Sequence, residues 1–291
     1  MLVSFSLMRL APGDPVTVLL GENATLENVA RMRELLGLNG SYLDQLATYL
    51  SGIASGSLGQ SVVFGVPVTT LIGQALPVTL QLMLVSMLLT VVVAVPLAVY
   101  VAVHPTGRIA SLFLVGSSFF VSMPVFFVGL IALLVAAVWL KIAPVAGIVG
   151  NLPGAINYLW LPSLVIALAL VPILTRVLIA SISDTLREEF VEVAIVRGVS
   201  GPRFAWQYLI RPSIAPTLSL LSYIIGSLFA STVVIELVFN LPGTGRLLVG
   251  AVGARDYPLV QGIVLFSGVF VVLVGTVADI ITVRIDPRVG Q

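Results

Sequence analysis

The chain has 291 residues, of which 58% are hydrophobic and 9% are charged, and its formal net charge at pH 7 is +1. Soluble domains carry roughly 25% charged residues, so this composition places the chain among membrane proteins. The sequence has no cysteine and one histidine, His104. These counts exclude a disulfide framework, a thiol nucleophile and a multi-histidine metal site within the chain.

The single lysine bears on nucleotide binding. Lys141 follows Leu140 rather than a glycine, so the sequence has no phosphate-binding loop of the GxxxxGK[ST] type. If ATP drives this protein, another chain must bind it. The near-neutral charge gives no indication of a nucleic acid partner, and we expect none.

The first ten residues, "MLVSFSLMRL", are apolar but too few to cross a bilayer. A membrane-spanning helix needs roughly 20 apolar residues. We interpret residues 1–10 as the remnant of a first transmembrane helix that has lost its beginning; the alternative is a short interfacial segment. The stretch lacks the basic start and small-residue cleavage site of a secretory signal.

Residues 11–75 are more polar, and we expect them to form a helical excursion outside the membrane. Thr25 is placed to cap a first helix with Asn28 in its first turn, and Gly37 or Gly40 to end it. A second helix is predicted in "SYLDQLATYLSGI", followed by a glycine-rich loop. About sixty residues hold their own core poorly, so this excursion should pack on the membrane part.

Five longer apolar stretches are predicted to span the membrane: 79–103, 109–140, 160–182, 216–238 and 259–283. The second is too long for one straight span, so either Pro124 kinks it or its first turns lie in the interface. The predicted fold is therefore an all-α integral membrane protein with about six transmembrane helices. Its core covers residues 76–285, and residues 286–291 form a cytoplasmic tail.

Arginines in the short loops predict the topology. Several share one side of the membrane if every span crosses: Arg108, Arg176, Arg187, Arg197, Arg203, Arg211, Arg284 and Arg288. Basic residues mark the cytoplasmic ends of spans, so this side is the cytoplasm. The excursion 11–75 and the loops 141–159 and 239–258 are then outside.

The stretch 185–212 is unusually charged for this chain. A helix is predicted from about Thr185 to Arg197, in which Glu188 and Glu192 share one face. Gly198 suits the left-handed position that ends a helix. Ser200 can cap a second helix that starts near Pro202. This helix-turn-helix should lie along the cytoplasmic surface.

Residues of two kinds make this unit a candidate docking site. Ala194 and Gly198 are small enough to let a partner backbone approach. The charged side chains of Glu188, Glu192, Arg197 and Arg203 can pair with that partner. An aromatic face of Phe204, Trp206 and Tyr208 is expected on the second helix. The alternative is an interfacial amphipathic helix with no partner.

Two acids near the outer side are candidates for the translocation path or outer gate. Glu236 lies near the outer end of the span 216–238, and Asp256 lies just before the last span. Acids at membrane depth are functional hypotheses by default, so Glu236 is expected to line the outer mouth. Capping of the last span is the favoured role for Asp256. Asp279, near the inner end of that span, is expected to pair with Arg284.

Several motifs resemble one transporter family. Glu192, Ala194 and Gly198 fit the E-A-A-x-x-x-G core of the cytoplasmic loop in permease subunits of ABC importers, although Val193 replaces the middle alanine. Four further segments resemble the dipeptide/oligopeptide/nickel group of these permeases: "APGDP" at 11–15, "FNLPGTGRLL" at 239–248, "ARDYPLVQG" at 254–262 and "DPRV" at 286–289. Together they cover nearly the whole chain. Ile210 and Pro212 only loosely match the later part of the cytoplasmic loop.

The resemblance implies a permease in a bacterial cell membrane that imports peptides delivered by an extracytoplasmic binding protein. It implies a homologous second permease, and two ATP-binding subunits that use ATP and Mg²⁺ and dock on the loop 185–212. This chain would bind no cofactor and perform no bond chemistry. The alternative is an ATP-independent channel or secondary carrier. A membrane-embedded enzyme is disfavoured, because the sequence offers no nucleophile-base pair or metal cluster.

Overall fold

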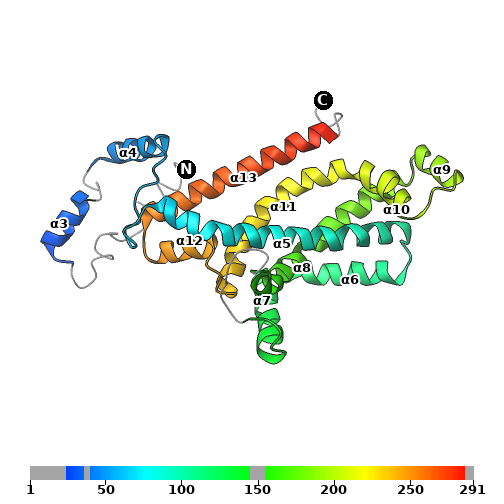
Figure 1. Ribbon diagram of the computed structural model, residues 1–291, viewed down its shortest axis with the longest axis horizontal. Helices are drawn as coiled ribbons and strands as arrows, with labels where there is room; N and C mark the ends of the chain where they lie inside the picture. The colour runs from blue at the N-terminus through cyan, green and yellow to red at the C-terminus, as the bar shows by residue number, and fades with distance from the viewer. Residues whose placement is uncertain (1–23, 36–39, 145–154, 286–291) are drawn as a thin grey trace. The chain divides into compact units, whose positions relative to one another are not determined.

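The computed structural model describes residues 24–35, 40–144 and 155–285, and for some helical residues, including Asp279, only the backbone. These ranges consist of helices and loops, with one isolated β-bridge between Gln60 and Pro67 (Figure 1). The all-α prediction is confirmed. The expected remnant span 1–10, Gly37, the tail 286–291 and the Asp279–Arg284 pair lie outside what is described.

The chain divides into two compact units. The first unit contains residues up to 79 together with 242–270, and the second contains 80–241 together with the residues from 271 onward. The long helices α5 (Val68–Val103) and α13 (Tyr257–Ile285) each contribute to both units.

Two short helices of the first unit begin at side-chain caps. Helix α3 (Leu26–Leu35) starts after Thr25, whose Oγ1 accepts a hydrogen bond from the Asn28 amide at 3.3 Å, as predicted. Helix α4 (Tyr42–Ala54) starts at a capping box, in which Ser41 Oγ accepts from the Asp44 amide and Asp44 Oδ2 accepts from the Ser41 amide. The hydroxyl of Ser41 also donates to the Asp44 carboxylate, and this bond lowers the pKa of Asp44 below its ordinary value.

The core of the first unit joins α5, α13 and α12 (Thr244–Gly253). Val68 and Ile72 of α5 pack with Leu259 and Ile263 of α13 and with Ala251 of α12. Gly262 permits the close approach of α13 to α5, since a Cβ there would lie 2.5 Å from Val68 Cγ1. This core fixes the loop 55–67 beside the start of α13, because Leu58 also packs on it.

The second unit is a helical bundle (Figure 1). Its complete elements are α6 (Arg108–Ser122), α7 (Val125–Leu133), η2 (Leu134–Trp139), α8 (Ile156–Thr185), α9 (Glu189–Val196), α10 (Gly201–Phe204), η3 (Ala205–Ile210) and α11 (Arg211–Val238). Helix α8 is the most buried of these and packs against α6, α7 and α11. Gly129 lets α7 approach α11, since a Cβ there would lie 3.3 Å from Ile235 Cδ1.

The predicted spans all fall on helices. Three are long and apolar enough to cross a membrane: Val68–Val103, Ile156–Thr185 and Tyr257–Ala278. The stretch 109–140 is broken between Ser122 and Val125, and its two parts meet at a bend of 100°. The break at Pro124 is the predicted one, because proline cannot donate the amide that would continue the helix. The predicted span 216–238 lies in α11, where Ile224–Val238 is a shorter apolar helix.

Candidate functional site

The charged loop between α8 and α11 begins later than predicted. Helix α8 continues to Thr185, and the chain turns at Leu186–Glu188 before α9 starts at Glu189. In this turn the amide of Glu188 bonds the Thr185 carbonyl at 3.1 Å. The apolar pattern of α8 runs into the charged stretch without a helix breaker, so the sequence did not reveal where one helix ends.

Gly198 ends α9 as predicted. Its φ of 75° is in the left-handed region, which favours glycine. The Gly198 amide bonds the Ile195 carbonyl at 2.9 Å, and the Val199 amide bonds the Ala194 carbonyl at 3.1 Å. These two bonds form a Schellman motif, which fixes the direction of the chain after the helix.

The second helix of the loop is longer than predicted. It starts at Gly201 with Pro202 in its first turn, while Ser200 takes the N-cap position without a side-chain cap bond. It then continues through the π-helical η3 directly into α11. In η3 the Arg211 amide bonds the Trp206 carbonyl, five residues earlier, just before Pro212.

Aromatic rings join the two helices of the loop. Tyr208 stacks on Phe204 with ring centroids 5.9 Å apart and on Phe190 of α9 at 6.5 Å. Trp206 was predicted on this face, but its side chain is 57% exposed. Residues four apart share a helix face, whereas residues two apart do not.

The structure separates the predicted docking residues into two groups. Glu188, Glu192, Arg197, Gly198 and Arg203 are exposed. Ala194 is only 2% exposed, because it packs inside the chain with Val191 and is not open to a partner. The exposed surface at the loop therefore presents charged side chains around a glycine turn.

Polar contacts at the base attach the loop to the bundle. Thr185 Oγ1 and Ser213 Oγ lie 3.1 Å apart and are both buried, which joins the end of α8 to the start of α11. Arg203 Nε donates to Gln207 Oε1 at 3.2 Å within the second helix. The loop is thus attached at its base to two long helices, α8 and α11.

Arg176 differs from the other arginines assigned to the cytoplasmic loop. It lies inside α8, and its Nη2 donates to Ser117 Oγ at 2.8 Å and to Ser118 Oγ at 3.0 Å. From the sequence, this arginine was predicted to belong to the loop cluster. The continuous α8 places it within a candidate membrane span instead.

In the first unit, the loop before the last span contains an unpredicted helix, α12. Thr244 begins this helix, and its amide donates to Thr79 Oγ1 at 2.9 Å. A cap supplied by α5 is invisible in the local sequence, and the glycines suggested only a turn. The signal that could have revealed α12 is the spacing of Leu247 and Ala251, which share a helix face.

Asp256 joins two loops of the first unit. Its carboxylate accepts hydrogen bonds from the Ser61 hydroxyl and from the amides of Val62 and Val63, the latter two at 3.2 Å. It also accepts from the Leu259 amide at 3.3 Å, so it caps α13 as the sequence favoured. Asp256 is fully buried. Its role as an outer gate stays a prediction.

Glu236 is fully buried near the end of α11, where its carbonyl accepts from the Leu241 amide at 2.8 Å. The chain turns at Asn240, which has a φ of 54°. A carboxylate without exposed surface is expensive unless it is hydrogen-bonded or paired. The position at the outer mouth of a path stays a prediction for Glu236.

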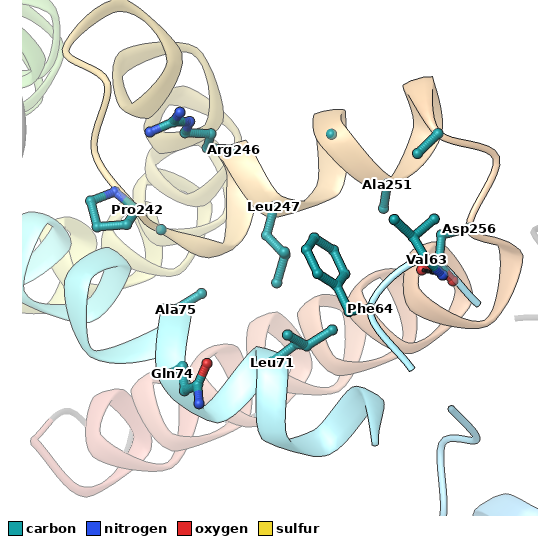
Figure 2. Close-up of a pocket in the computed structure, with 13 residues that line it drawn as sticks. Val63, Phe64, Leu71, Gln74, Ala75, Pro242, Arg246, Leu247, Ala251 and Asp256 are labelled. Carbon is teal, nitrogen blue, oxygen red and sulfur yellow. Dashed lines mark hydrogen bonds between the residues drawn. The ribbon is translucent and has the colours of Figure 1, made fainter. Parts of the chain in front are cut away.

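An apolar cavity of about 430 Å³ lies in the first unit, between α12, the start of α5 and the loop 61–67. Figure 2 shows Phe64 between Leu247 of α12 and Leu71 of α5. Phe64 is 56% exposed. The loop that Asp256 anchors therefore carries an aromatic ring to the rim of this cavity.

Long apolar helices, a broken span and an exposed charged loop together indicate an integral membrane protein. The family of binding-protein-dependent transport system inner membrane components matches residues 94–291, and the N-terminal model of these membrane components matches residues 1–83. The chain belongs to this family. It is a multi-pass protein of the bacterial inner membrane, as the sequence analysis predicted.

Curated relatives are similar over almost the whole chain. A putative peptide transport system permease of Brucella abortus is 34% identical over 99% of this chain and 93% of its own. The oligopeptide transport system permease AppB of Bacillus subtilis is 32% identical over 99% of this chain and 93% of its own. The nickel import system permease NikB of Staphylococcus aureus is 30% identical over 98% and 85%.

A solved structure supports the fold. An amino acid ABC transporter, crystallised with histidines, matches 74% of this chain and 94% of its own chain with a TM-score of 0.53. The identity is 14%, so this likeness bears on the fold alone.

Proposed function

We propose that this chain is the membrane permease subunit of an ATP-driven importer of di- and oligopeptides. The observation that carries the proposal is the exposed charged surface of α9 and its glycine turn, fixed by the Schellman motif and attached to α8 and α11. A partner that moves this surface would move both helices. The peptide cargo is supported by two relatives, a putative peptide permease and an oligopeptide permease.

The proposed assembly contains a homologous second permease, two ATP-binding subunits and an extracytoplasmic binding protein. ATP and Mg²⁺ are used by the ATP-binding subunits, which dock on the loop 186–212. Exposed apolar side chains of the first unit, including Phe64, Val249 and Val252, suit a protein partner on the outer side. The binding protein is the partner we assign to that surface.

The mechanism is alternating access between two states. ATP closes the ATP-binding subunits, the loop follows, and the path opens outward to receive cargo from the binding protein. Hydrolysis returns the path to the inward-open state. Each state must be bound preferentially by a different ligand, since a ligand with equal affinity for both shifts nothing. This chain forms the translocation path and carries the loop through which the movement reaches the membrane helices. It makes and breaks no covalent bonds.

Charge reversal on the loop tests the assignment. Glu192→Arg should lower recovery of the ATP-binding subunits with this chain on the order of tenfold or more, because an interface charge would face its own sign. Recovery is measured by gentle-detergent pull-down and quantitative mass spectrometry. Glu27→Arg, the same change on exposed α3, is the matched control and should leave recovery unchanged.

Two outcomes contradict the proposal in different ways. Full recovery and normal peptide uptake with Glu192→Arg would remove the docking role of α9. Failure of the unaltered chain to recover any ATP-binding subunit, under conditions that preserve other importers, would favour an ATP-independent carrier.

A further inference from the structure

Arg176 is a charged residue at membrane depth. It lies nine residues before Thr185, where α8 ends, so it is about 14 Å from that helix end. Ser117 lies nine residues after Arg108, where α6 begins, so it is also about 14 Å from its own helix end. The hydrocarbon core is about 30 Å thick. If α6 and α8 enter the hydrocarbon core at these ends, both helices place the guanidinium about halfway across it.

Two serines hold Arg176 in one position. The hydroxyls of Ser117 and Ser118 both donate to the Leu114 carbonyl, at 3.1 and 3.0 Å. Their oxygens are thereby oriented as acceptors, and Arg176 Nη2 donates to both. The guanidinium is thus held on α6 at this depth and does not extend toward the interface.

The side chain has donors left over. Nη2 is engaged by the serines, whereas the N–H groups of Nε and Nη1 have no acceptor among the described residues. Arg176 is also exposed at the surface of the bundle. Three N–H donors of the charged guanidinium are therefore available to an acceptor that the described part of the chain does not provide.

Among the described residues, no acid lies at the level of Arg176 on the helices that pack around it. The sequence has no Asp or Glu between Asp44 and Asp184, so α6 and α7 carry no acid, and Asp184 lies eight residues beyond Arg176, at the end of α8. Glu236 of α11, which also packs on α8, lies 25 residues after Arg211, where α11 begins beside the end of α8. Serine hydroxyls are neutral and cannot compensate a charge. Ionisable residues inside membranes face the bundle interior or a water-filled cavity, and they mark substrate pathways.

The broken span is a second indication of water at this depth. Helix α6 ends at Ser122, four residues after Ser118, and the chain then bends by 100°. Ser122 and Pro124 are exposed rather than packed inside the chain. Irregular backbone at membrane depth is tolerated where it is buried in protein or lines a water-filled cavity.

We propose that Arg176, positioned by Ser117 and Ser118, binds a carboxylate group of the cargo on a water-filled path through the membrane. The inference rests on the proposed importer function for the identity of the cargo as a peptide, which carries a terminal carboxylate. A guanidinium recognises a carboxylate by charge-assisted hydrogen bonds. The site favours anionic solutes at the midplane and gives cargo an intermediate position between the two sides.

The absence of cysteine in the chain makes the test specific. Leu114→Cys places the chain's one thiol a helical turn from Ser118, on a side chain that is 57% exposed, and leaves the arginine and both serines intact. The assembled complex is treated with an anionic sulfonatoethyl and a cationic trimethylammonium methanethiosulfonate reagent. Modification of this chain is followed by intact mass.

All rates are expressed relative to those of a free thiol in solution, because a thiolate reacts faster with the cationic reagent. On this relative scale the anionic reagent should be favoured about tenfold, since the guanidinium attracts the anion and repels the cation. Arg176→Gln in the Leu114→Cys chain should bring the ratio to about one, and Arg176→Lys should retain the preference. Arg31→Gln, which removes an exposed arginine of α3 outside the docking loop, is the control and should leave the ratio unchanged. A free dipeptide with binding protein and ATP should slow the anionic reaction, and the same dipeptide as its C-terminal amide should not.

Three results would overturn the site. The first is that the thiol is not modified in the assembled complex, which would mean that lipid or the second permease covers it. The second is that both reagents react at equal rates. The third is that the preference for the anionic reagent survives Arg176→Gln. The rate ratio is measured without cargo or ATP, so it is independent of the proposed function. Loss of dipeptide protection with the ratio intact would overturn the cargo assignment, and absence of peptide uptake by the unaltered complex would overturn the importer.

Discussion

Asp256 of the first unit and the acids Glu188 and Glu192 of the second differ in what surrounds them. Asp256 is fully buried and accepts hydrogen bonds from four donors, three in the loop 55–67 and one in the first turn of α13. Glu188 and Glu192 are exposed beside a turn whose own backbone bonds are complete. The same chemical group therefore stabilises the fold in one unit and remains available to a partner in the other.

The largest effect is expected from the buried acid. Asp256→Ala leaves the Ser61 hydroxyl and the amides of Val62, Val63 and Leu259 without their acceptor. The Ser61 hydroxyl and the Leu259 amide are buried, and each orphaned buried donor costs about 1–3 kcal/mol, so the loss should be at least about 2 kcal/mol. The amides of Val62 and Val63 are only partly buried and add less. Thermal unfolding of the purified complex and proteolysis of the loop 55–67 measure it. Asp256→Asn keeps one acceptor oxygen, so its melting temperature should lie between those of the unaltered chain and Asp256→Ala. An unchanged melting temperature for Asp256→Ala would refute the anchoring role.

An intermediate effect is expected at the turn of the second unit. Gly198→Val places a β-branched residue at a φ of 75°, which costs about 1–2 kcal/mol and distorts the turn although the surrounding space is open. Cargo-stimulated ATP hydrolysis should fall while the protein stays in the membrane. Gly198→Asn, which tolerates this conformation, should keep most of the activity. Equal loss in both variants would assign the effect to side-chain bulk at a docked surface rather than to the turn.

The smallest effect is expected at an exposed acid that has a local structural task. The pKa of Asp44 is lowered because Ser41 donates hydrogen bonds to its carboxylate. The charged carboxylate therefore stabilises α4 at pH values above its ordinary pKa of 3.8. That contribution is lost as the pH falls through the lowered pKa. Asp44→Asn should reduce hydrogen-exchange protection of α4 at neutral pH, and the difference from the unaltered chain should vanish in acid. A difference that persists unchanged at low pH would contradict the capping box as its source.

Local patterns in the sequence predicted what depends on neighbouring residues. The spans follow from runs of apolar residues, the break from Pro124, and the end of α9 from Gly198. The caps at Thr25 and Asp256 follow from short polar side chains just before apolar helices. Such features are fixed within one or two turns of chain.

Long-range contacts account for what the sequence could not show. Ser61 and Asp256 are 195 residues apart, and the cap of α12 comes from Thr79, 165 residues from Thr244. The burial of Ala194 and the bond between Arg176 and Ser117 likewise depend on which helices pack together. A motif match identified Ala194 as important, but only the packing shows that it faces inward.

The π-helical stretch η3 changes the angular phase of the helix that carries the loop. A π turn uses one residue more than an α turn, and each residue of an α-helix advances by about 100°. Residues 201–238 thus form one continuous helix in which the side chains before η3 are rotated relative to those after it. A chain shortened by one residue within Ala205–Ile210 can relax to α geometry and keep the face of α11 in place. The same deletion inside α8 would rotate every later residue of that helix away from its partners.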